Sequence, residues 1–247
     1  MPEYKRPKSL MPMATSYCPG CMHALATRLV ADVIGELDQV NNAINVVSVG
    51  CSALNLYTWA GDVIGAAHGR APAVATGLKR SLPDRLVFTY QGDGDLAAIG
   101  LAEIMSAANR GENFTVIFAN NQTYGMTGGQ MAPTTLIGQK TTTTIYGRDP
   151  KTTGYPLQMC ELLSVLKAPV FIARYALNSP KGVADAKKGI KKAFELQLAG
   201  KGFTFIELLT NCPTNWGMAP LQTLEYMNTN TIPYFKPGIY KDEEGEA

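Results

Sequence analysis

The chain has almost no net charge and no long apolar run, and these two absences exclude two classes of partner. In 247 residues, 22 basic side chains nearly balance 20 acidic ones, leaving a formal charge of +2. A charge this small gives no argument for a nucleic-acid partner, and no basic run stands out in the sequence. No apolar run is long enough to span a bilayer. We therefore expect a globular protein whose partners include neither nucleic acid nor a membrane.

The beginning of the sequence also lacks the apolar core of a secretory signal. A cytoplasmic location is therefore expected. Residues 1–17 contain three prolines and show no periodicity, which indicates an N-terminal arm. Residues 241–247 are mostly charged and are expected to fray. Between these ends no linker or repeat is visible, so we predict a single domain spanning residues 1–247.

The order of apolar segments predicts an α/β fold. Short apolar runs typical of buried strands alternate with segments of helical periodicity. The predicted strands are 44–49, 86–90, 114–119, 170–175 and 203–209. The predicted helices are 25–37, 73–79, 96–109 (with Asp95 as its cap), 157–167 and 180–200. This alternation predicts a mostly parallel sheet with helices on both faces. Residues 122–155 have no sustained period and indicate a long functional loop.

Five cysteines do not suit a disulfide framework, because the number is odd and cytoplasmic thiols are reduced. Cys160 lies in an apolar helical segment and is expected to be a small buried hydrophobe. Four thiolates, those of Cys18, Cys21, Cys51 and Cys212, would bind structural zinc or an iron–sulfur cluster. Their wide scatter favours a cluster inside an enzyme core, with zinc as the alternative. A thioredoxin-like Cys18–Cys21 pair would leave Cys51 and Cys212 unexplained.

Two polar segments follow predicted strands: Gly92-Asp93-Gly94-Asp95 and Asn120-Asn121. Ligands of open parallel sheets bind at the carboxyl ends of the strands. Glycines there let the backbone approach a phosphate, and the following helix presents free N–H groups. Aspartate and amide oxygens suit Mg²⁺. A Gly-Asp-Gly tripeptide alone indicates only a turn, but the flanking strand and helix and the downstream asparagines favour a magnesium–diphosphate site.

Together these segments resemble the β subunit of a 2-oxoacid:ferredoxin oxidoreductase. The resemblance runs from Tyr17-Cys18-Pro19-Gly20-Cys21 to residues 211–216 and includes Gly50-Cys51-Ser52, His68-Gly69-Arg70 and residues 120–130. It implies a thiamine diphosphate-binding (pyrophosphate-domain) fold. It also implies a [4Fe–4S] cluster on Cys18, Cys21, Cys51 and Cys212. Mg²⁺ would be held by Asp93, the Asn121 side chain and the Thr123 carbonyl.

The same resemblance implies which residues lie against thiamine diphosphate. They are Gly50, Cys51, Ser52, His68, Gly92, Asp93, Gly94, Asp95, Asn121, Thr123, Gly125, Met126 and Thr127. His68 is expected to be catalytic, whereas His23 is interpreted as structural. Arg70 is a candidate contact for a carboxylate or phosphate of the substrate or of CoA.

The implied reaction is oxidative decarboxylation of a 2-oxoacid with CoA to acyl-CoA and CO₂, reducing ferredoxin. No motif here supplies the glutamate that activates thiamine. In the family it comes from an α subunit, so we expect the chain to need α, with or without γ and δ subunits. Members of the family act on pyruvate, 2-oxoglutarate, branched-chain 2-oxoacids or arylpyruvates. The threonine-rich segments at 134–135 and 141–144 favour branched-chain acids or 2-oxoglutarate for this chain. The alternatives are a non-oxidative thiamine decarboxylase or synthase subunit with structural zinc, and a zinc-stabilised binding subunit.

Overall fold

One sheet forms the centre of the structure, a computed structural model that describes residues 5–243. Within these residues the sheet has seven strands in the order β2-β1-β3-β4-β8-β7-β9. Every neighbouring pair is parallel except β7 and β9, which are antiparallel. In that spatial order the strands are Asp62–Gly65, Ala43–Val47, Leu86–Gly92, Thr115–Asn120, Thr204–Leu209, Phe171–Ala176 and Gly238–Asp242.

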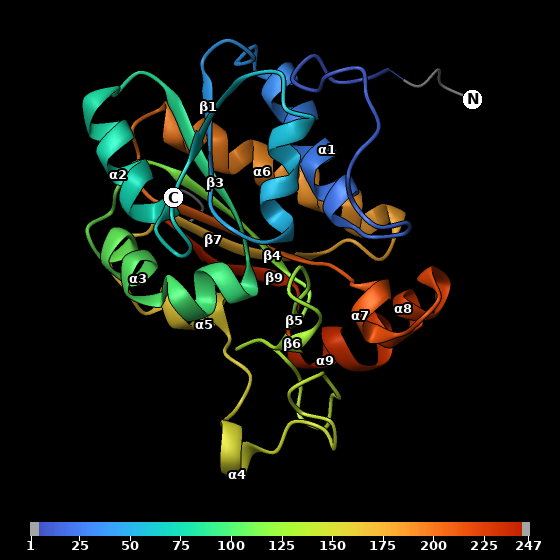
Figure 1. The fold of residues 1–247 in the computed structure, drawn as a ribbon. Coiled ribbons are helices and arrows are strands. Elements are labelled where there is room, and N and C mark those ends of the chain that lie inside the picture. The colour runs from blue at the N-terminus through green and yellow to red at the C-terminus, as the bar shows by residue number, and fades with distance from the viewer. Residues whose placement is uncertain (1–4, 244–247) are drawn as a thin grey trace.

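Helices cover both faces of the sheet (Figure 1). On one side lie α1 (His23–Glu36) and α6 (Pro180–Leu198); on the other lie α2 (Ala71–Ser81), α3 (Leu101–Asn109) and α5 (Met159–Ser164). Side chains alternate along each strand, so Phe88 packs toward α1 and α6 whereas Val87 packs toward α2 and α3. The predicted mostly parallel α/β fold is therefore confirmed. No helix within residues 5–243 has the length and apolarity needed to cross a membrane.

All the predicted strands and helices occur, with their ends shifted by a few residues. Both edge strands were missed: β2 is short and largely exposed, and β9 is polar, so neither produces an apolar run. The prediction of a frayed tail is wrong for Lys241 and Asp242, which pair with Ile172 and Phe171. The remainder of the predicted tail, residues 244–247, lies outside the described residues, as do residues 1–4 of the arm. Elsewhere in the arm, Leu10 forms a bridge to Trp59.

The long loop contains a small hairpin, β5 (Thr123–Tyr124) with β6 (Gln130–Met131), and one short helix, α4 (Pro150–Thr153). Arg148 holds the rest of this loop together, because its side chain donates to backbone carbonyls that precede and follow it in sequence, including those of Thr135 and Tyr155. After β8 come short helical elements near the hairpin (Figure 1). These are α7 (Pro213–Trp216), α8 (Pro220–Tyr226), a π-helix (Met227–Thr231) and α9 (Ile232–Tyr234).

Candidate functional site

A pocket lies at the carboxyl ends of four neighbouring strands. After β1 come residues 50–52, after β2 His68, after β3 residues 92–95, and after β4 residues 121–127. Because β2, β1, β3 and β4 are adjacent and parallel, these segments meet at one edge of the sheet. The pocket is lined by His23, Val49, Gly50, Cys51, Ser52, His68, Gly92, Asp93, Gly94, Asp95, Asn121, Thr123, Tyr124, Gly125, Met126 and Thr127. All the residues expected at thiamine diphosphate therefore line one pocket.

Asp93 is the buried carboxylate at the start of the helix that follows β3. One oxygen accepts from the Gly94 N–H at 2.9 Å and the other from the Thr134 hydroxyl at 2.7 Å. Burial raises the pKa of Asp93 to about 6. The prediction that Asp95 caps this helix is wrong, because the Asp93 side chain is the cap. Each Asp93 oxygen retains lone-pair capacity for a further ligand.

Both carboxylate oxygens of Asp95 accept hydrogen bonds from groups of the protein. Its Oδ1 accepts from the Ser48 hydroxyl at 2.8 Å and the Gly69 N–H at 2.6 Å, and its Oδ2 accepts from Gln91 at 2.6 Å. His68 Nδ1 lies 2.5 Å from the same Oδ1. Since a carboxylate accepts, this contact assigns the Nδ1 proton of the imidazole and leaves Nε2 for other partners. Asp95 thus orients His68 at the pocket wall.

The turn after β4 has an unusual backbone. Gln122 has a φ of +62°, in the left-handed region that residues other than glycine seldom adopt. Just before it, the Asn121 side-chain oxygen accepts from the Thr123 N–H at 3.3 Å. Tyr124 packs so closely on Gly94 that any Cβ there would overlap its ring. The turn and the Gly-Asp-Gly segment are therefore held against each other.

The four cysteines predicted as ligands come together beside this pocket although they are far apart in sequence. Asn211 connects their segments: its Oδ1 accepts from the Met22 N–H at 3.0 Å, and its Nδ2 donates to the Gly20 carbonyl at 3.2 Å. A Cβ added to Gly125 would lie 3.1 Å from the Cys51 sulfur and 3.8 Å from the Cys212 sulfur.

Burial raises the pKa of Cys21 to about 12, and the nearby Cys212, Cys51 and Cys18 add to this shift. In the described chain, no three His, Cys, Asp or Glu side chains form a ready-made site for a single metal ion. The thiols are therefore close enough to interact, but they are not arranged around one ion.

The pocket residues fit a magnesium-bound, anionic cofactor. Asp93, Asn121 and the Thr123 backbone supply hard oxygen donors of the kind that Mg²⁺ prefers. Gly50 and Gly92 leave open space where a Cβ would stand. The Ser52 hydroxyl is buried and has no hydrogen-bond partner in the part of the chain that the structure describes. A polar ligand in the pocket would satisfy it.

Three further residues lie as follows. His23 is buried, contacts the Tyr90 hydroxyl at 2.7 Å through Nδ1 and also lines the pocket, so its structural interpretation is incomplete. Arg70 pairs with Glu103 of α3 and is not among the lining residues. Cys160 is fully buried, as expected.

The contacts of Thr134, Ser48 and Gln91 with the two aspartates were not predicted. They depend on tertiary folding, and these residues belong to no local motif.

Comparison with known proteins places these residues in context. Residues 48–208 match the thiamine pyrophosphate enzyme family over its C-terminal TPP binding domain. Ketoisovalerate oxidoreductase subunit VorA of Methanothermobacter thermautotrophicus is 50% identical over 212 residues, which are 86% of this chain and 44% of that protein. The chain thus spans less than half the length of that relative.

Two further matches cover most of both proteins. 2-Oxoglutarate synthase subunit KorB of Methanocaldococcus jannaschii is 35% identical over 236 residues, covering 92% of this chain and 82% of that protein. Among solved structures, the 2-oxoglutarate:ferredoxin oxidoreductase from Magnetococcus marinus, with 2-oxoglutarate, coenzyme A and succinyl-CoA bound, matches with a TM-score of 0.80. That match has 26% identity and covers 98% of this chain and 86% of that one.

Proposed function

The chain belongs to the 2-oxoacid:ferredoxin oxidoreductase β subunits, a family of thiamine pyrophosphate enzymes, and on this premise we propose that it holds the cofactors of such a complex. The complex would decarboxylate a 2-oxoacid oxidatively with CoA, yielding acyl-CoA and CO₂ and reducing ferredoxin. The observation that carries the proposal is one pocket edge where the Asp93–Asn121 oxygen donors lie beside the converging cysteines.

Mg²⁺ and the diphosphate are assigned to the segments after β3 and β4. Asp93 and the Asn121 side chain would bind Mg²⁺ together with the Thr123 carbonyl. Gly92, beside which a Cβ would meet nothing within 4 Å, lets the backbone approach the diphosphate, and N–H groups after Gly94 at the start of the following helix would face it. The Ser52 hydroxyl, unpartnered within the described chain, could donate to the bound cofactor, and the free Nε2 of His68 would accept from it.

A [4Fe–4S] cluster is assigned to Cys18, Cys21, Cys51 and Cys212. Cys51 belongs to both parts of the proposal, because it lines the pocket and its sulfur, like that of Cys212, lies within 4 Å of the position a Cβ on Gly125 would take. Asn215 donates to the Cys212 sulfur at 3.3 Å and to the Gly125 carbonyl at 2.9 Å, so one amide joins the cysteine segment to the pocket loop. The chain thereby holds the electron acceptor next to the cofactor.

When bound, thiamine diphosphate supplies the carbanion and electron sink for decarboxylation, and an iron–sulfur cluster supplies a one-electron acceptor. The chain's own part is binding and orientation. Asp95 fixes the His68 imidazole so that its free nitrogen is available to a bound group. The lining residues of the described chain include no glutamate, so the group that activates thiamine must come from a partner, which we assign to the α subunit.

For the substrate we propose a branched-chain 2-oxoacid. In residues 5–243 no lysine or arginine lines the pocket, so this chain itself provides no cation for the second carboxylate of 2-oxoglutarate. Val49 and Met126 instead provide apolar surface. The 50% identity to a ketoisovalerate oxidoreductase subunit, against 35% to a 2-oxoglutarate synthase subunit, supports the same choice.

The proposal is tested by assaying the single chain and the complete complex anaerobically with CoA, a viologen dye and each of four 2-oxoacids. We expect the complex to reduce the dye fastest with 2-oxoisovalerate and more slowly with 2-oxoglutarate, pyruvate and arylpyruvate. The single chain should show no turnover, because it lacks the activating glutamate. Robust reduction by the chain alone, or no 2-oxoacid-dependent reduction by the complex, would refute the proposal.

A further inference from the structure

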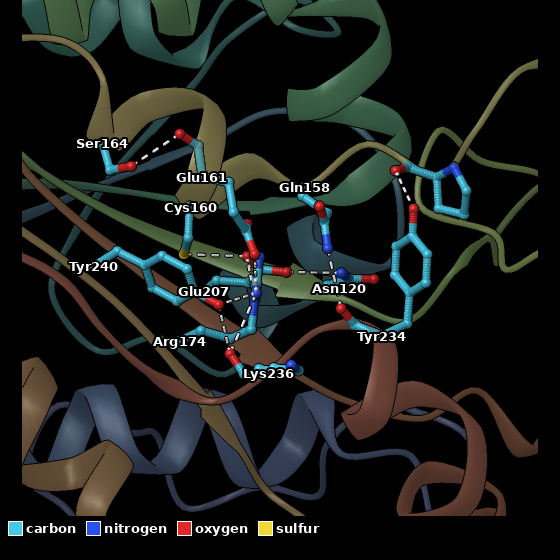
Figure 2. A network of polar contacts seen from close by, with 11 residues as sticks. Asn120, Gln158, Cys160, Glu161, Ser164, Arg174, Glu207, Tyr234, Lys236 and Tyr240 are labelled. Atoms are coloured by element: carbon cyan, nitrogen blue, oxygen red, sulfur yellow. Dashed lines mark hydrogen bonds and ion pairs between the residues drawn. The ribbon is translucent and has the colours of Figure 1, made fainter.

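A buried polar network lies on the face of the sheet that α2, α3 and α5 cover, next to the turn after β4 (Figure 2). Glu207 of β8 and Arg174 of β7 are both fully buried, and Arg174 Nε lies 2.9 Å from a Glu207 oxygen. Burial lowers the pKa of Arg174, but Glu207 and Glu161 raise it by more. Arg174 is therefore charged, although neither it nor Glu207 lines the pocket.

Glu207 is the centre of this network. Asn120 Nδ2 donates to its Oε1 at 2.8 Å, and the Cys160 thiol donates to its Oε2 at 3.2 Å (Figure 2). The positive charge opposite Glu207 is that of Arg174. A carboxylate only accepts, so the Asn120 NH₂ group must face Glu207. The other Asn120 atom, Oδ1, is buried and has no partner within residues 5–243. Glu207 alone thus fixes the orientation of this amide.

Asn120 is the last residue of β4 and directly precedes the turn assigned to Mg²⁺. Its carbonyl accepts from the Thr210 N–H at 2.9 Å and from the Thr210 hydroxyl at 3.2 Å, so both the backbone and the side chain are anchored to β8 or to the residue after it. Successive side chains of a strand point to opposite faces. Holding Asn120 on the face that α2, α3 and α5 cover therefore directs the chain so that the next residue, Asn121, lines the pocket.

The turn needs such an anchor because its backbone is strained at Gln122. Residues in this conformation persist only where their surroundings determine it. A second anchor lies on the far side: Gln122 Nε2 donates to Thr231 at 2.9 Å, and its carbonyl accepts from Thr135 at 2.6 Å. The strained residue is thus fixed from both ends, and two of the three proposed Mg²⁺ ligands, Asn121 and Thr123, lie on either side of it.

We propose that Asn120, held by the buried Glu207–Arg174 pair, is a positioning residue that aims Asn121 and Thr123 at the metal and diphosphate. This inference rests on the proposed function. It predicts a specific loss in the Asn120→Ala variant of the complete complex. The apparent dissociation constants for thiamine diphosphate and for Mg²⁺ should each rise about tenfold or more, as for other residues that orient metal ligands. With both cofactors saturating, kcat should stay within about twofold of wild type, since Asn120 touches no reacting atom.

Tyr240→Phe is the matched control. The Tyr240 hydroxyl accepts from Arg174 at 2.6 Å and donates to the Lys236 carbonyl at 2.7 Å, so this change removes two hydrogen bonds from the same network without touching Asn120. Urea unfolding of the cofactor-free proteins gives the loss of stability of each variant. We expect Tyr240→Phe to lower stability while leaving both dissociation constants near wild type.

Three outcomes decide between the possibilities. Weakened cofactor binding in Asn120→Ala alone supports the inference; unchanged binding in it, or equal weakening in both variants, overturns it. If Asn120→Ala does not fold, Asn120→Ser replaces it, because the shorter hydroxyl cannot span the contact to Glu207. A wild-type complex with no Mg²⁺-dependent thiamine diphosphate binding would instead overturn the proposed function.

Discussion

Replacing Asp93 by asparagine is expected to abolish turnover of the complete complex while leaving the chain folded. The amide has almost the same shape as the carboxylate, so the contact to Thr134 and the start of the helix can persist. What is lost is the negative charge that a hard Mg²⁺ ion requires among its oxygen ligands. We expect Mg²⁺-dependent affinity for thiamine diphosphate to fall by roughly a hundredfold or more. Titration calorimetry and the viologen assay measure the two effects.

The free energy of unfolding separates this effect from misfolding. Asp93 is almost fully buried, and a buried charge without its ion is unfavourable, so the cofactor-free Asp93→Asn variant should be at least as stable as wild type. Asp149→Asn is the matched control: Asp149 caps the short α4 helix, and it is not one of the pocket residues. Near-normal turnover in Asp93→Asn would remove this residue from the proposed Mg²⁺ site.

The second large effect is expected from Cys51→Ser. Serine is a poor ligand for iron, and Cys51 is the proposed ligand that also lines the pocket. The variant complex should lose the iron–sulfur cluster and all reduction of the viologen dye. Iron analysis of anaerobically purified complex and its visible spectrum provide the measurement, with about four irons assigned to this chain in the wild type.

Cys160→Ala is the control for Cys51→Ser within the same chain. Its thiol is fully buried on α5 and contacts Glu207, away from the four converging cysteines. Removing it costs a hydrogen bond, about 1 kcal/mol of stability, but no proposed cluster ligand. The control should therefore keep its iron and its activity. If Cys51→Ser retained the iron of the wild type, the ligand assignment would be wrong.

The sequence carried enough information for most of the sheet. Strands β3 and β4 are short apolar runs, and each is followed by a polar segment at the carboxyl edge of the sheet. Parallel pairing alone then places Asp93 beside Asn121. The edge strands β2 and β9 were missed because one face of an edge strand is exposed, so the apolar pattern is weak.

Individual contacts within the site were harder to predict. The helix cap was assigned to Asp95 instead of Asp93, because which of two nearby carboxylates caps a helix depends on where the backbone turns. The partners of these carboxylates also lie far away in sequence: Thr134 is in the long loop and Ser48 follows β1. The Asn211 contacts that join the first and last cysteine segments likewise span almost the whole chain. Local patterns contain no trace of such contacts.

The most direct test of the central claim is the visible spectrum of anaerobically purified complex, recorded before and after addition of the 2-oxoacid without an external acceptor. If the cysteines hold an iron–sulfur cluster beside the thiamine site, the protein is brown, contains iron, and its broad absorption bleaches when the substrate is added. A colourless protein that contains zinc, or a brown one whose spectrum the substrate leaves unchanged, would contradict the account.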